Sequence, residues 1–288
     1  MSVVVAWIAL VAGGCVSQGP AASDAPIRVE SFERTLSDGA IARGMIATID
    51  LTHPRLRVEV TGPLDGAEPG VEALLETTPA WAMRRGLDLA VNANYFAMTR
   101  PREPYASGGA ADVLGLCVSD GLVVSPPRMF GGRGDPALLL RADGRGEAAH
   151  VEHPPGREVR HAVAGIGGSA SDPDRGSLLI EGGIDRSATA RVEPRARHPR
   201  TAAGLASGGR LLVLVVVDGR QPGWSVGMTL AELASLLRSQ GVHDAVNLDG
   251  GGSSAFVWRE AGAWRTNRAS EPSGFRPVST SLGFKLEP

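Results

Sequence analysis

Short apolar runs recur along the chain, and turns rich in glycine, proline and aspartate separate them. This alternation is typical of many short strands and not of a helical bundle. A short helix is predicted at 78–86, where Thr78 is the expected N-cap and Gly86 the stop. Strands are predicted at 44–51, 55–62, 87–96, 113–125 and 137–153, and the last two ranges have the pattern of hairpins.

The clearest unit lies in the C-terminal third of the chain. The run LLVLVVVDG (211–219) is apolar almost to its end, as expected of a central strand buried on both faces. A helix is predicted over 229–241, opened by a capping box of Thr229 and Glu232, and the strand DAVNLDG (244–250) follows. This order predicts a βαβ crossover with two parallel strands. The fold class expected is therefore α+β, with a mixed, largely antiparallel sheet and a C-terminal βαβ crossover.

The crossover places two aspartates at one edge of the sheet. Asp218 ends the first parallel strand and Asp249 ends the second. The carboxyl edge of such strands is where open α/β sheets bind ligands. Either aspartate alone has a simpler explanation, because Asp-Gly begins many ordinary turns. The pair at one edge favours a functional site.

Three glycines and two serines directly follow Asp249, namely Gly250, Gly251, Gly252, Ser253 and Ser254. Consecutive glycines let main-chain N–H groups converge on an anion, and the serines add hydroxyl donors. No lysine follows the glycines, so the run is not a Walker A loop. A serine-hydrolase elbow is disfavoured because the last histidine, His243, precedes the serines.

A counter-charge for an anion is available just before the crossover. Arg200 and Thr201 lie there, and arginine is the preferred bidentate partner of phosphate or carboxylate. No cofactor is expected. Oxygen atoms of Asp218, Asn247 and Asp249 leave a divalent cation such as calcium or magnesium open.

Composition adds only broad limits. The 288 residues are 43% hydrophobic and 21% charged, which is ordinary for a globular chain of one large domain or two closely packed ones. The formal net charge of -2 gives no indication of a nucleic-acid partner.

The N-terminus has the pattern of an export signal. The apolar run 3–14 is too short to span a bilayer but suits the core of a signal peptide. Small residues directly before Cys15 resemble the lipobox of a bacterial lipoprotein, and a diacylated Cys15 would anchor the chain to a membrane. A plain secretory signal is the alternative. We expect residues 1–26 to be signal and tether, 27–288 to be the folded domain, and the protein to face the periplasm or cell surface.

Several motifs together resemble the phosphodiester glycosidase family. They are LAVNANYF, HPRTAAGL, LLVLVVVDGR, the crossover segment ending in NLDGGGSS, and TNRAS. The resemblance is densest in 198–288. It implies a hydrolase that cleaves the bond between the anomeric carbon of a sugar and a phosphodiester oxygen, acting on N-acetylglucosamine-1-phosphate-type linkages of cell-envelope or exported glycans.

The resemblance also implies roles for individual residues. Arg200, together with the amides and hydroxyls of 250–254, is expected to hold the phosphate, and Thr201 belongs to the same binding set. Asn92 and Asn247 are expected to hold sugar hydroxyls. Asp249 or Asp218 would act as nucleophile or as base for water. A lipoprotein that binds glycans or phosphosugars without cleaving them is the alternative.

Overall fold

The computed structural model describes residues 25–66, 68–100, 103–128, 133–168, 171–172 and 176–288. The predicted signal sequence and Cys15 lie outside the described residues. Mainly β structure fills the described part, with two short α-helices, α1 (Thr78–Arg85) and α2 (Leu230–Ser239). Neither helix is long and apolar enough to cross a membrane.

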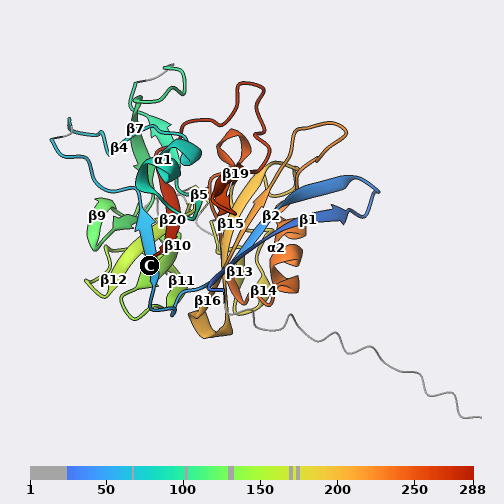
Figure 1. Ribbon diagram of the computed structural model, residues 1–288, viewed down its shortest axis with the longest axis horizontal. Coiled ribbons are helices and arrows are strands. Elements are labelled where there is room, and N and C mark those ends of the chain that lie inside the picture. The colour runs from blue at the N-terminus through green and yellow to red at the C-terminus, as the bar shows by residue number, and fades with distance from the viewer. Residues whose placement is uncertain (1–24, 67, 101–102, 129–132, 169–170, 173–175) are drawn as a thin grey trace, which may run out of the picture.

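The largest sheet is seven-stranded and antiparallel throughout. Its order is β1-β2-β16-β15-β17-β13-β14. The strands are β1 (Ile27–Thr35), β2 (Ile41–Asp50), β16 (Leu211–Val217), β15 (Arg200–Ala206), β17 (Asp244–Asn247), β13 (Ile180–Glu181) and β14 (Ile184–Asp185). Helix α2 covers one face of this sheet (Figure 1).

Two further sheets have five strands each. One has the order β19-β18-β5-β20-β3, with β19 (Ala263–Thr266), β18 (Phe256–Glu260), β5 (Leu89–Asn92), β20 (Ser281–Leu286) and β3 (Leu56–Val60). The other has the order β11-β10-β12-β8-β9, with β11 (Gly146–Val151), β10 (Asp135–Arg141), β12 (Val159–Ala164), β8 (Cys117–Ser119) and β9 (Leu122–Ser125).

A small sheet of β4 (Ala73–Leu74), β7 (Ala110–Leu114) and β6 (Tyr95–Met98) completes the set. Two short 3₁₀ turns occur at Ser207–Gly209 and Gly251–Ser253. The second of these lies in the glycine-rich stretch after β17.

Strand β16 is buried on both faces, as its apolar run predicts. Val213, Val215 and Val217 pack into the cluster that contains the apolar stripe of α2. The alternate residues Leu212 and Leu214 pack into the main core, which joins this sheet to the two five-stranded sheets. An apolar residue at every position of β16 follows from this double burial.

The predicted crossover is present, but the sheet around it differs from the prediction. β16 and β17 both pair antiparallel with β15, which lies between them, so the two strands run parallel without touching. Because the described strand pairs are all antiparallel and fall into several sheets, the fold is mainly β and not the α+β fold expected. The order of the elements along the chain does not show that β15, which precedes both strands, lies between them in the sheet.

Some local predictions also need correction. Thr77, and not Thr78, caps α1, because its hydroxyl accepts the Ala80 N–H at 3.3 Å. Gly86 ends the helix in the left-handed region, as predicted. The range 113–125 is divided between two sheets, and only β8 and β9 form its hairpin. The hairpin predicted at 137–153 is confirmed as β10 and β11.

Candidate active site

The main chain of Asp249 is held by Asn92, the last residue of β5, and by Ala93, which follows it. The Asp249 N–H donates to the Ala93 carbonyl at 2.9 Å. The side-chain amide of Asn92 donates to the Asp249 carbonyl at 2.6 Å. The end of β5 thus fixes the point at which the chain leaves β17 and enters the glycine-rich segment 249–254, the Asp249 loop.

Asn92 and Thr201 position this loop through a buried network. The Asn92 Oδ1 atom accepts hydrogen bonds from the Thr201 hydroxyl at 2.7 Å and from the Ala255 N–H at 3.1 Å. Both side chains are fully buried. The roles expected for Asn92 and Thr201 in binding substrate are therefore corrected, because these polar atoms are already engaged within the protein.

Atoms of other residues lie so close to the three glycines that a Cβ atom would have little room. A Cβ atom at Gly250 would lie 2.8 Å from the Pro199 carbonyl oxygen. Gly251 has φ +61, and a Cβ there would lie 3.2 Å from the Arg220 guanidinium. A Cβ at Gly252 would collide with the carboxylate of Glu271. Main-chain atoms at Gly250 and side chains at Gly251 and Gly252 therefore approach the loop where only glycine leaves room.

The Asp249 carboxyl has an unusual protonation equilibrium. Its residue is half-buried, and burial raises the pKa to about 7. The Ser253 hydroxyl, the Gly250 N–H at 2.8 Å and the charge of Arg276 oppose this shift by favouring the carboxylate. A carboxyl that titrates near neutral pH is suited to proton transfer or to nucleophilic attack.

Several buried polar atoms near this carboxyl lack a partner within hydrogen-bonding geometry among the described residues. They are Asn247 Oδ1, Ser253 Oγ, Ser254 Oγ and Arg276 Nε. Buried polar atoms are rarely left unpaired unless a ligand or water completes them. These atoms make the Asp249 loop a candidate binding site, and the substrate-binding roles of Asn247, Ser253 and Ser254 stay predictions.

Tyr95 of β6 lies near the Asp249 carboxyl. Its hydroxyl accepts a hydrogen bond from the Asn247 side-chain amide at 2.8 Å. Burial and the nearby Asp249 carboxylate raise the pKa of Tyr95 far above its ordinary value. The phenol is therefore a neutral donor or acceptor at the rim of the loop.

Two arginines that the sequence did not single out reach the loop. Arg276 forms an ion pair with Glu271 over Gly252, and its guanidinium lies 4.7 Å from the Tyr105 ring centre. Arg220 lies against Gly251 and is 3.2 Å from Nδ1 of His198. Two guanidinium groups therefore lie beside the loop, and that of Arg276 is paired with a carboxylate.

Arg200 does not provide the phosphate clamp that was expected. Its Nε donates to the Met228 carbonyl at 3.1 Å, and its Nη1 donates to the Val192 carbonyl at 2.9 Å. Its Nη2 donates to the carbonyls of Glu193 and Ala196, both at 2.8 Å. With at most one N–H left, Arg200 is a buried anchor for the loop before β15, and this corrects its predicted role.

Asp218 ends β16 at the same sheet edge as Asp249, as predicted, but it faces different neighbours. Its carboxyl accepts hydrogen bonds from Trp224 Nε1 at 3.0 Å and from Asn267 Nδ2 at 2.9 Å. Burial raises the pKa of Asp218, and these two donors lower it. Asp218 lines a cavity of about 610 Å³ with Trp224, and no residue of the glycine loop takes part in that cavity.

The sequence left open a divalent cation held by Asp218, Asn247 and Asp249, but the described residues contain no cluster of metal ligands. Within the described ranges, no group of three or more His, Cys, Asp and Glu side chains could hold a metal ion. The two carboxyls expected to share a cation, those of Asp218 and Asp249, have separate sets of partners.

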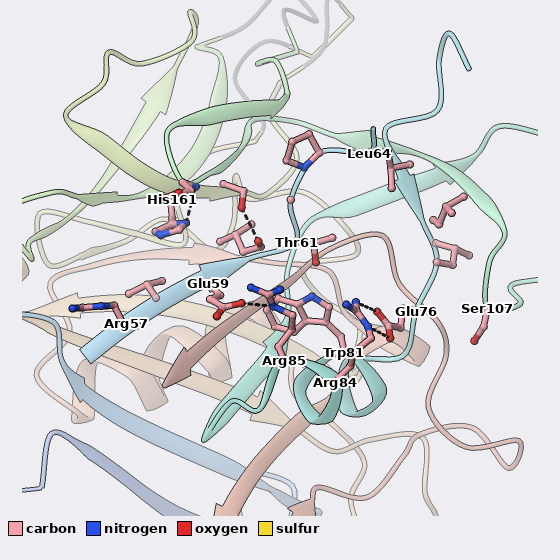
Figure 2. Close-up of a pocket in the computed structure, with 18 of the residues that line it drawn as sticks. Arg57, Glu59, Thr61, Leu64, Glu76, Trp81, Arg84, Arg85, Ser107 and His161 are labelled. Carbon is pink, nitrogen blue, oxygen red and sulfur yellow. Dashed lines mark hydrogen bonds and ion pairs between the residues drawn. The ribbon is translucent and has the colours of Figure 1, made fainter. Parts of the chain in front are cut away.

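A cavity of about 840 Å³ lies elsewhere. It is bounded by β3 and α1, and it contains none of the predicted site residues (Figure 2). Its walls carry ion pairs of Arg85 with Glu59 at 2.6 Å and Arg84 with Glu76 at 2.6 Å. Among the described residues, none that lines this cavity has a buried polar side-chain atom without a partner, unlike those on and beside the Asp249 loop.

The fold and site define a mainly β protein with a near-neutral carboxyl in a glycine-rich loop flanked by two guanidinium groups. The sequence profile of the phosphodiester glycosidase family matches residues 85–285. The chain belongs to this family.

Individual relatives agree with this assignment. The chain is 31% identical over 181 residues to an uncharacterized SPbeta prophage-derived protein, YomE, of Bacillus subtilis. The match covers 62% of this chain and only 25% of that protein.

Solved structures share the fold. The catalytic domain of zebrafish N-acetylglucosamine-1-phosphodiester alpha-N-acetylglucosaminidase, auto-inhibited by its pro-peptide, superposes with a TM-score of 0.65 at 23% identity, over 94% of this chain and 85% of that one. A hypothetical protein from Synechocystis gives 0.61 at 14% identity, over 91% and 62% of the two chains. A putative exported protein from Burkholderia pseudomallei gives 0.60 at 18% identity, over 86% and 74%.

Proposed function

We propose that the protein is a hydrolase that cleaves the glycosidic bond of a sugar-1-phosphodiester. The observation that carries the proposal is the Asp249 carboxyl, with a pKa of about 7, beside buried side-chain atoms of Asn247, Ser254 and Arg276 that have no partner among the described residues. Family membership and the name of the zebrafish relative support an N-acetylglucosamine-1-phosphate type of substrate in cell-envelope or exported glycans.

In the proposed reaction, the bond between the anomeric carbon and the phosphodiester oxygen breaks. The oxygen leaves with the phosphate as a monoester, and water supplies the hydroxyl of the released sugar and a proton. Phosphate is a good leaving group, so a strong general acid is less necessary than in ordinary glycosidases. Stabilising the negative charge that develops on the phosphate then becomes the main task.

The residues divide between these tasks. Arg220, Arg276 and the Gly252 amide bind the phosphate, with hydroxyl donors from Ser253 and Ser254. The Gly250 N–H already donates to the Asp249 carboxyl, and the Gly251 N–H donates to the Pro199 carbonyl. Asn247 and Tyr95 contact the sugar. Asp249 attacks the anomeric carbon or deprotonates the attacking water. Asp218, predicted from the sequence as the alternative for this task, holds the neighbouring loops in this proposal.

Sugar release tests the proposal. Purified protein is incubated with the methyl phosphodiester of N-acetylglucosamine-1-phosphate, and free N-acetylglucosamine is measured. We expect release by the wild type and loss of at least about a hundredfold in kcat/KM for Asp249→Asn, as for removal of a principal catalytic group. Binding of the diester without release would instead favour the alternative, a phosphosugar-binding protein that performs no chemistry.

We also propose that the protein is exported and lipidated at Cys15. The small residues before Cys15 support this proposal. Incorporation of labelled palmitate in a bacterial host, absent in Cys15→Ser, is the expected result. A mature chain that is secreted without label would support a plain signal peptide.

A further inference from the structure

Arg220 lies against the Asp249 loop without a carboxylate to neutralise its charge. A Cβ atom at Gly251 would lie between 3.2 and 3.5 Å from atoms of the Arg220 guanidinium, so this group packs directly on the loop. Arg276, the other arginine there, is paired with Glu271. Among the described residues, the side chain of Arg220 has only Nδ1 of His198, at 3.2 Å, within hydrogen-bonding distance. Of the two arginines, Arg220 therefore keeps its charge available for an anion.

His198 meets Arg220 as a neutral acceptor. A guanidinium group donates hydrogen bonds and cannot accept them, so Nδ1 of His198 has to be the acceptor. The ring hydrogen then lies on Nε2, which is in contact with the Glu193 carboxylate, although this contact lacks the geometry of a full hydrogen bond. A histidine in this state orients the guanidinium of Arg220 without cancelling its charge.

The main chain that carries the His198 ring is bonded to its surroundings on both sides. The His198 N–H donates to the Met228 carbonyl at 3.2 Å, and the His198 carbonyl accepts from the Met228 N–H at 3.0 Å. The carbonyl of the next residue, Pro199, accepts the Gly251 N–H at 2.9 Å. The ring of His198 therefore has a fixed place relative to the Asp249 loop.

The backbone on either side of the contact between His198 and Arg220 is in an unfavourable conformation. Arg220 has φ +58, and Val192 and Glu193 have φ +70 and +50. Residues other than glycine rarely adopt this left-handed region, and they keep it where surrounding contacts hold them. Arg200 provides such contacts, since it donates to the carbonyls of Val192 at 2.9 Å and of Glu193 at 2.8 Å. The buried Arg200 thus stabilises the turn that brings Glu193 to His198.

We propose that His198 is a positioning residue, which holds Arg220 over Gly251 as a neutral acceptor so that the guanidinium meets the substrate phosphate with its full charge. The inference rests on the proposed function, in which Arg220 binds the phosphate, and adds a residue that acts through Arg220. A carboxylate in the place of His198 would hold the arginine but neutralise it. A small apolar side chain would leave the exposed Arg220 free to turn toward solvent.

Three substitutions at His198 separate these effects. In the Asp249→Asn parent, affinity for the methyl phosphodiester of N-acetylglucosamine-1-phosphate is measured by calorimetry at about pH 7.5, where an aspartate is ionised. His198→Asn places a neutral acceptor where Nδ1 lies and should bind within about twofold of the parent. His198→Ala, which has no acceptor, should weaken binding about fivefold. His198→Asp, which differs from the asparagine variant in charge, should weaken it about tenfold.

His53→Ala is the matched control. Nδ1 of this half-buried histidine accepts the Arg55 N–H at 3.3 Å in the turn between β2 and β3, so the change removes a similar acceptor away from the Asp249 loop. This variant should bind as the parent does.

Kinetics in the otherwise wild-type enzyme give a second readout. His198→Ala should lower kcat/KM on the methyl diester about fivefold, and His198→Asn should restore it. In the Arg220→Ala background His198→Ala should cost less than about twofold, because both changes remove the same interaction.

Equal losses in the asparagine, alanine and aspartate variants, or losses of His198→Ala and Arg220→Ala that add in full, would overturn the role of His198 and leave the proposed function standing. Binding that depends on His198 as expected, without sugar release by any of the proteins, would keep His198 as a positioning residue for a phosphate site and refute the proposed hydrolysis. A parent that does not bind the diester would refute both.

Discussion

The Asn92 side-chain amide donates to the main-chain carbonyl of Asp249 at 2.6 Å. Asn92 ends β5 of a five-stranded sheet, and Asp249 follows β17 of the seven-stranded sheet. The same Asn92 side chain accepts from Thr201 on β15 and from Ala255 beyond the glycine loop. One buried amide therefore sets the distance between β5, β15 and the candidate catalytic loop.

Exchanging this amide for a carboxyl should damage both folding and function. Asn92→Asp keeps the volume but turns an oxygen toward the Asp249 carbonyl, so a buried acceptor loses its donor. We expect the free energy of unfolding to fall by about 2 to 3 kcal/mol and sugar release to be largely lost. Urea denaturation measures the first effect.

Thr201→Val and Thr201→Ser form the matched pair for this network. The valine removes the donor to Asn92 and should cost about 1 to 2 kcal/mol, whereas the serine keeps the hydroxyl and should cost less. An Asn92→Asp protein as stable and active as the wild type would show that the network does not position Asp249.

Stability at alkaline pH should increase when the Asp249 charge is removed. The pKa of this carboxyl is about 7 in the folded protein and near its ordinary value of 3.8 when unfolded. Between these values the unfolded chain has released a proton that the folded chain retains, so this group makes stability fall as pH rises to about 7. Asp249→Asn should therefore gain on the order of 2 kcal/mol over the wild type at pH 8.

The stability gain of Asp249→Asn should shrink toward pH 4.5, where the folded wild type keeps the Asp249 carboxyl protonated. Urea unfolding of both proteins at the two pH values measures the difference. Asp65→Asn, a change at an exposed aspartate, is the control. A gain that is equal at both pH values would contradict the raised pKa.

The pH dependence of sugar release should follow the ionisation of the Asp249 carboxyl. If Asp249 acts as nucleophile or base, its ionised form is required, and kcat/KM should rise with pH through about 7 and then level off. Because the charge of Arg276 lowers the pKa of Asp249, Arg276→Gln should move the midpoint upward. A rate that falls through the same range would assign Asp249 the role of a general acid.

The sequence predicted the framework of the site better than its chemistry. Helix α2, the double burial of β16 and the shared edge of Asp218 and Asp249 follow from periodicity, capping and crossover geometry, which are local. Arg200 was misassigned because nothing in the sequence shows that carbonyls of the preceding loop take its N–H groups. Arg276 was missed because it reaches Gly252 only through a loop whose path is set by tertiary contacts.

This contrast makes Arg200 and Arg276 separable by experiment. Arg200→Ala removes hydrogen bonds to four main-chain carbonyls, of which those of Met228 and Glu193 keep a main-chain donor, so we expect a loss of about 3 kcal/mol or more in unfolding free energy. Arg276→Ala removes a side chain that is 24% exposed and should cost about 1 kcal/mol, while KM for the diester rises about tenfold or more. Stable Arg200→Ala protein with a raised KM would restore the phosphate clamp to Arg200.

Two glycine substitutions should separate folding from function in the same loop. At Gly250 an added methyl group would meet the Pro199 carbonyl, which is main chain, so Gly250→Ala should lose about 1 to 3 kcal/mol of stability. At Gly252 the methyl group would meet the ends of the Glu271 and Arg276 side chains, which can swing aside. Gly252→Ala should therefore unfold within about 1 kcal/mol of the wild type.

Gly252→Ala should nevertheless lose activity, because the displaced Arg276 can no longer face the phosphate or the Asp249 carboxyl. We expect a rise in KM similar to that of Arg276→Ala, and the double variant should lose little more than either single change, since both remove the same interaction. Unfolding curves and kcat/KM on the methyl diester measure the two effects on one preparation. If the losses of the two single changes add in full, Gly252 acts on the reaction by a route other than the position of Arg276.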